Sequence, residues 1–548
     1  MKYFLTLFMT AALAMGFTFS ANAASSRRTS ATTTTTEETT EETTEETTVQ
    51  TTTVPTDEDG NPLTGADLIC YNTLAKYKRW GAQPIEADYY SETLTENGAN
   101  VQKKTISYGT GDTFWVKRYN FSESVYREGF SAGAGTVSAD GTYESPYERF
   151  GVSLFIPGNS VEIRAYNTSS EEWFMTSNIE NDLLKEVLFI DTDSYHMILG
   201  LPAVYKNNCF DYNTMTIVPD EELAVTLTKV DGGYNVNYSF PHSPDYIGDI
   251  WCLESSRVLA DWTNSSLFSL LHLNYASNRR LCYDGYYFQT PSNYVPGGEN
   301  ILYRQPSNYT GSSLVSYSNI PVAYDLGYAT TYLCAQNQNE EGFWPTGPQS
   351  EWLYTDFGIT SYFYDTRFNT DFASNLIAAY RLYYDEVFLK ALLAYGDFFN
   401  SHAENNHYET ENGGWLVEDY GGQEGYSRTH CSLNHQLAEM NVLYKISYIT
   451  GVKSYKETAD NMLKGIEDTR DEWVQINNNL NYALYYTGSE ELVDYPYLTY
   501  NDLYTTQQIL KTYYHYTNDT LDYLMKCKKI WMDENEIIGY YTTEKVVD

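Results

Sequence analysis

The sequence lacks paired cysteines. Its seven cysteines, at positions 70, 209, 252, 282, 334, 431 and 527, are widely separated, and no two are spaced as Cys-x-x-Cys. This spacing excludes a cysteine-based zinc cluster and differs from the dense framework of a small disulfide-rich domain. The odd number leaves at least one thiol unpaired within the chain, and one or two disulfides remain compatible with the sequence.

Basic residues are also few. The chain of 548 residues has 34 Lys and Arg against 73 Asp and Glu, a formal net charge of -39. Sequence-independent binding to nucleic acid needs a basic surface, so we expect no nucleic-acid partner. The same charge argues against a polyanionic substrate unless a cleft is locally basic.

Long apolar runs are missing after the N-terminus. One such run, residues 3–19, follows Lys2 and precedes a small-x-small motif at residues 21–23. We therefore predict that residues 1–23 are an export signal peptide. The protein is expected to be secreted or held at the extracytoplasmic cell surface, and an uncleaved N-terminal anchor stays open.

Residues 24–62 have few apolar side chains to bury. They are rich in Thr and Glu and repeat Glu-Glu-Thr-Thr at 37–40, 41–44 and 45–48. Self-repelling charge without a core predicts a disordered tether, which would hold the folded part away from the cell envelope.

Tyrosine is abundant, with 54 residues against 23 Phe and 10 Trp. A phenol packs by its ring and hydrogen-bonds at its tip, which suits contact with sugars. Replacement of Phe by Tyr throughout the chain is the simpler interpretation of most of these residues.

The chain is too long for one core, so two or three domains are expected. Residues 63–320 read mostly as short strands, which predicts an antiparallel β-sandwich or barrel-like region, in one or two subdomains. The clearest hairpin joins the alternating segments 225–230 and 234–240 across a glycine-containing turn at 231–233.

Residues 321–537 change to helical periodicity. Gly451 is a helix stop signal, and Ser454 with Glu457 predicts a capping box. Successive antiparallel helices of about 15 residues can close a ring, so we predict an all-α (α/α) toroid with its loops around a central cleft. Helices are expected over 372–383, 433–448, 455–466, 503–514 and 521–531.

A loop between these helices carries reactive side chains. The segment Gly413–Gly422 places Glu418, Asp419 and Tyr420 between glycine pairs, with Trp415 nearby. Such a loop offers proton donors and acceptors and a flat apolar ring for a sugar. The alternative interpretation is a tight acidic turn whose aromatic residues only pack.

Six short segments of the helical region occur in a characteristic order. They are Gly342-Phe343-Trp344-Pro345, Phe363-Tyr364 with the helix after it, Val387-Phe388-Leu389, Trp415 to Tyr420, Leu433-Asn434 with Leu443-Tyr444, and Asn481-Tyr482-Ala483-Leu484 with Tyr500 and Gln507. In order and spacing they resemble the C-terminal helical domain of the glucuronyl C5-epimerases, which convert glucuronate to iduronate in heparan-type chains. The resemblance covers about residues 341–531, a third of the chain.

This resemblance implies an active site lined by Tyr420, Tyr482 and Tyr500, with Glu418 or Asp419 beside them. Inversion of C5 removes the proton α to the carboxylate from one face of the sugar and returns a proton to the other, so it needs two acid/base groups. Glu418 or Tyr420 would accept the proton, and Tyr500 or Tyr482 would donate one.

A uronate carboxylate also needs a cation, and the family has an Arg suited to this at the position of Tyr485 here. Arg428 is the best substitute, and Arg367 or Arg381 are others. The expected substrate-binding residues are Trp344, Arg367, Trp415, Asp419, Arg428 and Asn434.

Two other function classes stay open. A polysaccharide lyase or a glycoside hydrolase could use the same toroid, and a hydrolase would pair Glu418 or Asp419 with Asp365 or Asp371. A non-catalytic glycan-binding surface protein would use the aromatic residues as a stacking platform.

We expect no metal or cofactor. His435 and Glu439 lie on one helix face near His430, but no metalloprotease-type motif is present. The expected partner is a polysaccharide substrate, and the family resemblance implies a homodimer.

Overall fold

The computed structural model describes residues 55–541, with gaps at residues 57–58, 60, 122–147, 168–171, 177–186, 201, 207–212, 219–223, 243–244, 265–266, 268–277, 307, 423 and 489–491. The predicted signal peptide and most of the predicted tether lie outside the described residues. Six of the seven cysteines are described, and all six are buried and free; Cys209 lies in a gap. In the part of the chain that is described, no helix is both long and apolar enough to cross a bilayer.

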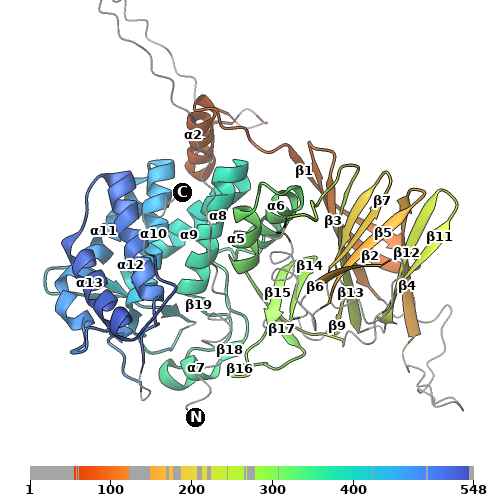
Figure 1. Ribbon diagram of the computed structural model, residues 1–548. Coiled ribbons are helices and arrows are strands. Elements are labelled where there is room, and N and C mark those ends of the chain that lie inside the picture. The colour runs from red at the N-terminus through yellow and green to blue at the C-terminus, as the bar shows by residue number, and fades with distance from the viewer. Residues whose placement is uncertain are drawn as a thin grey trace, which may run out of the picture.

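Antiparallel strands fill the N-terminal half, at the right of Figure 1, as the alternating sequence predicts. The largest sheet has nine strands in the order β1-β2-β3-β13-β8-β7-β5-β6, and β9 also pairs with β13. Its strands are β1 (Ala87–Glu96), β2 (Ala99–Tyr108), β3 (Thr113–Asn120), β5 (Val161–Asn167), β6 (Glu172–Thr176), β7 (Leu188–Thr192), β8 (His196–Leu199), β9 (Ala203–Lys206) and β13 (Tyr246–Ser255).

A three-stranded sheet packs against the first. Its strands are β11 (Ala224–Val230), β12 (Gly233–His242) and β4 (Glu148–Pro157), in that order. The predicted hairpin is confirmed, because β11 and β12 pair across a turn in which Gly232 has φ +76°, a conformation that glycine adopts without strain. Val236 of β12 lies in one buried cluster with Tyr119 and Ile163 of the large sheet, so the two sheets form a sandwich.

A four-stranded sheet connects the sandwich to the helices. Its order is β10-β17-β15-β14, with β10 (Thr214–Thr216), β14 (Arg279–Cys282), β15 (Gly285–Gln289) and β17 (Ile301–Gln305). Tyr286 of β15 belongs to the same buried cluster as Trp251 of the large sheet and Tyr328 of the helical half. The two halves therefore share a continuous core.

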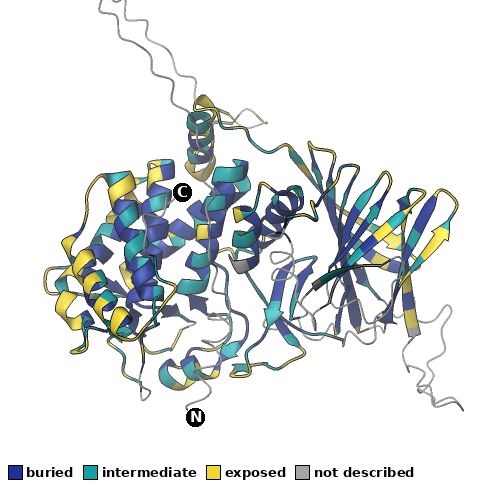
Figure 2. Ribbon diagram, in the orientation of Figure 1, coloured by how far each residue is buried: buried dark blue, intermediate teal, exposed yellow. Residues whose placement is uncertain are grey.

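Helices fill the C-terminal half. They are α5 (Asn308–Ser316), α6 (Pro321–Ala335), α7 (Glu351–Phe357), α8 (Thr366–Tyr383), α9 (Glu386–Asn405), α10 (Leu433–Thr450), α11 (Lys453–Asp468), α12 (Leu498–Ile509), which continues as a π turn (Leu510–Tyr514), and α13 (Asp519–Glu534); the N-terminal helix α2 (Gly65–Arg79) packs on α9. Central helix α8 contacts α5, α6, α9 and α10, and α10 contacts α8, α9, α11 and α12. Their facing sides are the buried ones in Figure 2.

The predicted helical segments are confirmed by α8, α10, α11, α12 and α13. Gly451 ends α10 with φ +79°, as its stop signal predicts. The predicted capping box is wrong, because α11 begins at Lys453 and its N-cap is Val452, without a side-chain cap.

The predicted all-α (α/α) toroid is also wrong. Figure 1 shows α5 and α6 at one end of the helical array and α13 at the other, with α8, α9 and α10 between them, so the array does not close into a ring. The region is not all-α either, since short ladders join β19 (Tyr364–Asp365) to β22 (Tyr420–Gly421), β20 (His407–Glu409) to β21 (Trp415–Val417), and β23 (Cys431–Ser432) to β24 (Ala483–Leu484). The apolar periodicity of a sequence is a local property, so it predicts neither the closure of a helical ring nor a β-ladder of only two residues.

Candidate active site

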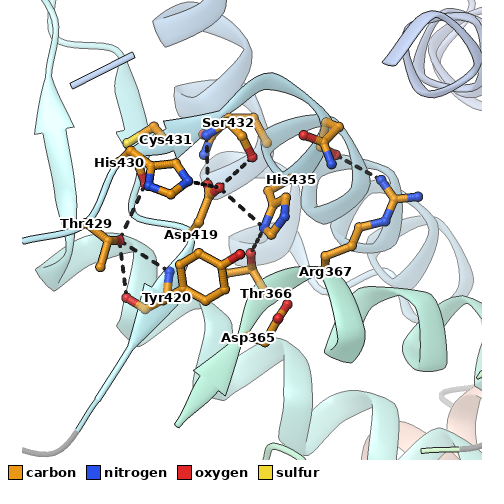
Figure 3. A network of polar contacts seen from close by, with 12 residues as sticks. Asp365, Thr366, Arg367, Asp419, Tyr420, Thr429, His430, Cys431, Ser432 and His435 are labelled. Carbon is orange, nitrogen blue, oxygen red and sulfur yellow. Dashed lines mark hydrogen bonds and ion pairs between the residues drawn. The ribbon is translucent and has the colours of Figure 1, made fainter. Parts of the chain in front are cut away.

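Two of these ladders bring four chain segments together. Asp365 pairs with Tyr420 across β19 and β22, and Ser432 pairs with Ala483 across β23 and β24. The backbone nitrogen of Thr366 also donates to the carbonyl of Asp419 at 3.1 Å. As Figure 3 shows, carboxylates, imidazoles and a phenol meet where these backbones converge.

Asp419 lies at the centre of the cluster and is completely buried. Its carboxylate accepts from the backbone nitrogen of Ser432 at 2.8 Å and from the Ser432 hydroxyl at 2.5 Å. Oδ2 lies 3.3 Å from His430 Nε2 and 3.6 Å from His435 Nδ1. Burial disfavours the carboxylate, but the two imidazoles and the Ser432 hydroxyl outweigh it, so the pKa of Asp419 is lowered.

Asp365 has the opposite titration behaviour. It is the N-cap of α8, and its carboxylate accepts from the backbone nitrogen of Phe368 at 3.0 Å. Burial raises its pKa, the cap hydrogen bond lowers it, and the negative charge of Asp419 raises it further, to about 7. Two neighbouring carboxyl groups therefore hold different protonation states near neutral pH.

Two imidazoles surround Asp419. His435 Nδ1 lies 2.5 Å from the Thr366 hydroxyl, and burial lowers the pKa of His435 to about 4, so its ring is neutral at pH 7. His430 is fully buried, and neither of its ring nitrogens makes a hydrogen bond of good geometry. Its ring is enclosed instead by aromatic rings, among them those of Trp352 at 5.8 Å and Tyr486 at 5.5 Å between centroids.

The structure brings Tyr420 and Tyr482 together at this cluster. Their ring centroids lie 5.8 and 6.0 Å from that of His430. Burial raises the pKa of both phenols well above the usual value, and nearby Asp365 and Asp419 raise it further. Both phenols can therefore donate a proton or a hydrogen bond at neutral pH, but they are poor bases.

Glu418 faces away from its neighbour Asp419. Its carboxylate accepts from Arg428 Nε at 2.6 Å and from the backbone nitrogen of Thr429 at 2.8 Å. Arg428 also donates to the carbonyl of His407 at 2.5 Å. The cation expected to bind a substrate carboxylate is thus bound to a carboxylate of the protein.

Arg367 is closer to the cluster but is also paired. Nε lies 3.0 Å from Asp371, and Nη1 lies 2.7 Å from Asp502 and 3.3 Å from the carbonyl of Asn434. The side-chain oxygen of Asn434 is buried and has no hydrogen-bond partner among the described residues.

Three other expected residues lie elsewhere. Trp344 is buried in the core, and its indole donates to the carbonyl of Cys334 at 2.9 Å. Trp415 is half-buried with its ring stacked on His407 at 4.5 Å. Tyr500 packs against Tyr540 at 5.5 Å rather than against the tyrosines of the cluster.

Two rings near the cluster were not predicted from the sequence. Tyr495 lies 5.9 Å from Tyr482, and Trp352 of α7 lies 6.1 Å from Tyr420. Tyr495 is held through its carbonyl, which accepts at 2.8 Å from the buried ammonium of Lys528. Lys528 lies on the otherwise apolar face of the helix predicted over 521–531. This was the signal in the sequence that could have pointed to the segment of Tyr495.

Two hollows in the described part of the chain lie away from the cluster. One of about 560 Å³ is lined by α2 and α9, and one of about 650 Å³ by residues 339–342 and the end of α9. Neither is lined by Asp365, Asp419 or Tyr420, so the candidate site rests on its chemistry and not on the size of a pocket.

Comparisons with known proteins assign no family to the chain. No protein-family model and no curated protein matches it. Among solved structures, it is similar to a family 76 glycoside hydrolase from a bovine Bacteroides thetaiotaomicron strain (11% identity, 83% of this chain and 78% of that chain, TM-score 0.35). It is also similar to a rhamnosidase from Klebsiella oxytoca with rhamnose bound (10% identity, 70% of this chain and 80% of that chain, TM-score 0.29). A third is a bacterial glucoamylase complexed with acarbose (11% identity, 75% of this chain and 59% of that chain, TM-score 0.24). At such identities and TM-scores these similarities decide neither the fold nor the reaction, and none identifies a glucuronyl C5-epimerase.

Proposed function

We propose that the protein is a carbohydrate-active enzyme that hydrolyses glycosidic bonds in a neutral glycan. The observation that carries this proposal is the pair Asp365 and Asp419, two adjoining carboxyl groups whose environments move their pKa values in opposite directions. Glycoside hydrolysis needs this combination, a protonated acid and an ionised carboxylate flanking the same bond.

In the proposed reaction Asp365 gives its proton to the glycosidic oxygen as the bond to the anomeric carbon breaks. A water molecule adds to that carbon and loses a proton to the carboxylate of Asp419, so one proton is given and one is taken. Because Asp419 is fully buried, side chains around it must move before water reaches it. The neutral phenols are suited to donate hydrogen bonds to sugar hydroxyls.

We propose a neutral substrate because the two cations expected to bind a uronate are already paired with carboxylates of the protein. Arg428 is bound by Glu418, and Arg367 is bound by Asp371 and Asp502. A uronate carboxylate would have to displace one of these carboxylates, and it would approach a cluster that already holds Asp365 and Asp419. A neutral sugar meets no such repulsion.

C5-epimerisation of glucuronate in a polysaccharide is the second candidate. The convergence of Tyr420, Tyr482 and Tyr495 favours it, because three phenols around one site could supply acid/base groups to both faces of a sugar. Arg367 would then have to exchange Asp502 for the substrate carboxylate. Polysaccharide lysis would use the same groups and expel the substituent at C4.

Product analysis in deuterated water separates these reactions. The mature protein would be incubated with neutral polysaccharides (cellulose, mannan and xylan oligomers) and with heparosan. New reducing ends from a neutral glycan, without deuterium at C5, support hydrolysis. Deuterium at C5 of heparosan without cleavage supports epimerisation, and unsaturated ends indicate a lyase. No reaction with any neutral polymer would count against the hydrolase.

The predicted export signal at residues 1–23 leads us to propose that the enzyme acts outside the cytoplasm. A protein exported from the cytoplasm and tethered by residues 24–62 would meet extracellular or envelope polysaccharides.

A further inference from the structure

Tyr485 combines two features that are unusual for a tyrosine. Its backbone has φ +61°, in the left-handed region, and its side chain is 40% exposed. A bulky residue in this conformation is strained. Tyr362 and Tyr384 share the conformation but are less exposed, so exposure sets Tyr485 apart from the other tyrosines with positive φ.

The ring of Tyr485 ends a three-layer stack. It lies parallel to the ring of Tyr408, with 4.1 Å between centroids and 9° between planes. The guanidinium carbon of Arg428 lies 3.7 Å from the same Tyr408 centroid. Two groups this close to one centroid must occupy opposite faces of Tyr408. The outer face of Tyr485 is therefore the free end of the stack, and among the described residues no second aromatic ring covers it.

The stack is anchored at its other end, by Arg428. Arg428 is fixed by Glu418 at 2.6 Å and by the carbonyl of His407 at 2.5 Å. Cation–π contact holds a guanidinium and a phenol ring in one orientation. Glu418, which points away from the catalytic cluster, thereby gains a role in holding the platform rigid.

The platform adjoins the candidate active site along the chain and through the β23–β24 ladder. Tyr485 directly follows β24, whose partner β23 carries Ser432, a donor to Asp419. Tyr482, three residues earlier, lies at the cluster itself. The exposed ring therefore follows directly on the ladder whose other strand holds Asp419.

We propose that Tyr485 forms a sugar-stacking subsite, in which one pyranose unit of a neutral glycan packs its apolar face on the outer face of the ring. This inference rests on the proposed hydrolysis in one respect, that another unit of the same chain occupies the Asp365–Asp419 site. The substrate is then an oligosaccharide or polysaccharide long enough to reach both places.

Binding measured without cleavage tests this subsite. In an Asp365→Asn background, calorimetry would follow cellohexaose, mannohexaose and xylohexaose. Tyr485→Asn removes the ring without adding strain, because Asn tolerates the left-handed region. Tyr485→Phe keeps the stack, and Tyr90→Ala removes another exposed ring, from β1, as a control. Circular dichroism and thermal melts would confirm folding of each variant.

We expect at least one hexaose to bind, with affinity about tenfold weaker in Tyr485→Asn and unchanged in Tyr485→Phe and Tyr90→Ala. Equal hexaose affinity in Tyr485→Asn and its parent, or failure of every hexaose to bind, would overturn the subsite. A hexaose that binds through Tyr485 but is never cleaved by the wild type would refute hydrolysis and leave the subsite standing.

Discussion

The sandwich and the candidate active site bury carboxylates in opposite ways. In the sandwich, Arg118 donates to Asp249 at 2.9 and 2.7 Å and also binds Asp284 at 2.7 Å. In the helical half, no Lys or Arg among the described residues lies within ion-pair distance of Asp365 or Asp419. The guanidinium of Arg118 ties Asp249 and Asp284 into the structure, whereas Asp365 and Asp419 have no such partner in the described part of the chain.

The same contrast separates adjacent residues of one loop. Glu418 has its cation in Arg428, while Asp419 is held by hydroxyl, amide and imidazole groups. Ion pairing therefore distinguishes the structural carboxylates from the candidate catalytic ones, and substitution of each class should have different consequences.

The largest effect is expected for Asp365→Asn. An amide cannot donate the proton of the proposed reaction, and loss of a general acid typically lowers kcat by about 10²–10⁴-fold. Asn is still a good N-cap for α8, so the melting temperature should not fall. Steady-state rates and a thermal melt would check both statements, with Asp371→Asn as the matched carboxylate on α8. An Asp365→Asn enzyme of near-normal rate would remove Asp365 from the mechanism.

Asp249→Asn should act on stability and not on catalysis. It leaves the buried guanidinium of Arg118 without its bidentate partner, and breaking a buried pair costs about 3–5 kcal/mol. Urea unfolding would measure the loss in free energy of unfolding, and kcat per folded molecule should match the wild type. A large loss of kcat in the folded variant would mean that Asp249 also contributes to catalysis, and that ion pairing does not separate structural carboxylates from catalytic ones.

Tyr420→Phe is expected to have the smallest effect of the three. If the phenol only donates a hydrogen bond to the substrate, its removal costs about 0.5–1.5 kcal/mol, which lowers kcat/KM by roughly two- to tenfold. Abolished turnover with intact folding would instead favour Tyr420 as an acid/base group, as C5-epimerisation requires.

Much of the secondary structure could be predicted from the sequence, because it depends on local patterns. Apolar spacing located α8 and α10, and alternation around Gly232 located the β11–β12 hairpin. The toroid could not be predicted reliably, because ring closure depends on contact between helices far apart in the chain.

The candidate site was only partly predictable. The loop carrying Asp419 and Tyr420 was located from its composition, but its pairing with Asp365 depends on backbone hydrogen bonds between distant segments. Glu418 and Asp419 have different partners, since Glu418 binds Arg428 and Asp419 binds Ser432. Their adjacent positions in the sequence did not show which of the two joins Asp365.

The pH dependence of kcat/KM tests the central claim most directly, since it reports the ionisation of the free enzyme. Asp365, with its pKa raised to about 7, must be protonated to act as the acid, and Asp419, with its pKa lowered, must be ionised. Activity on the neutral glycan should therefore be retained on the acid side of pH 7. It should fall above about pH 7, by up to tenfold per pH unit, as Asp365 loses its proton. A rate that stays constant or rises between pH 6 and pH 9 would contradict the account.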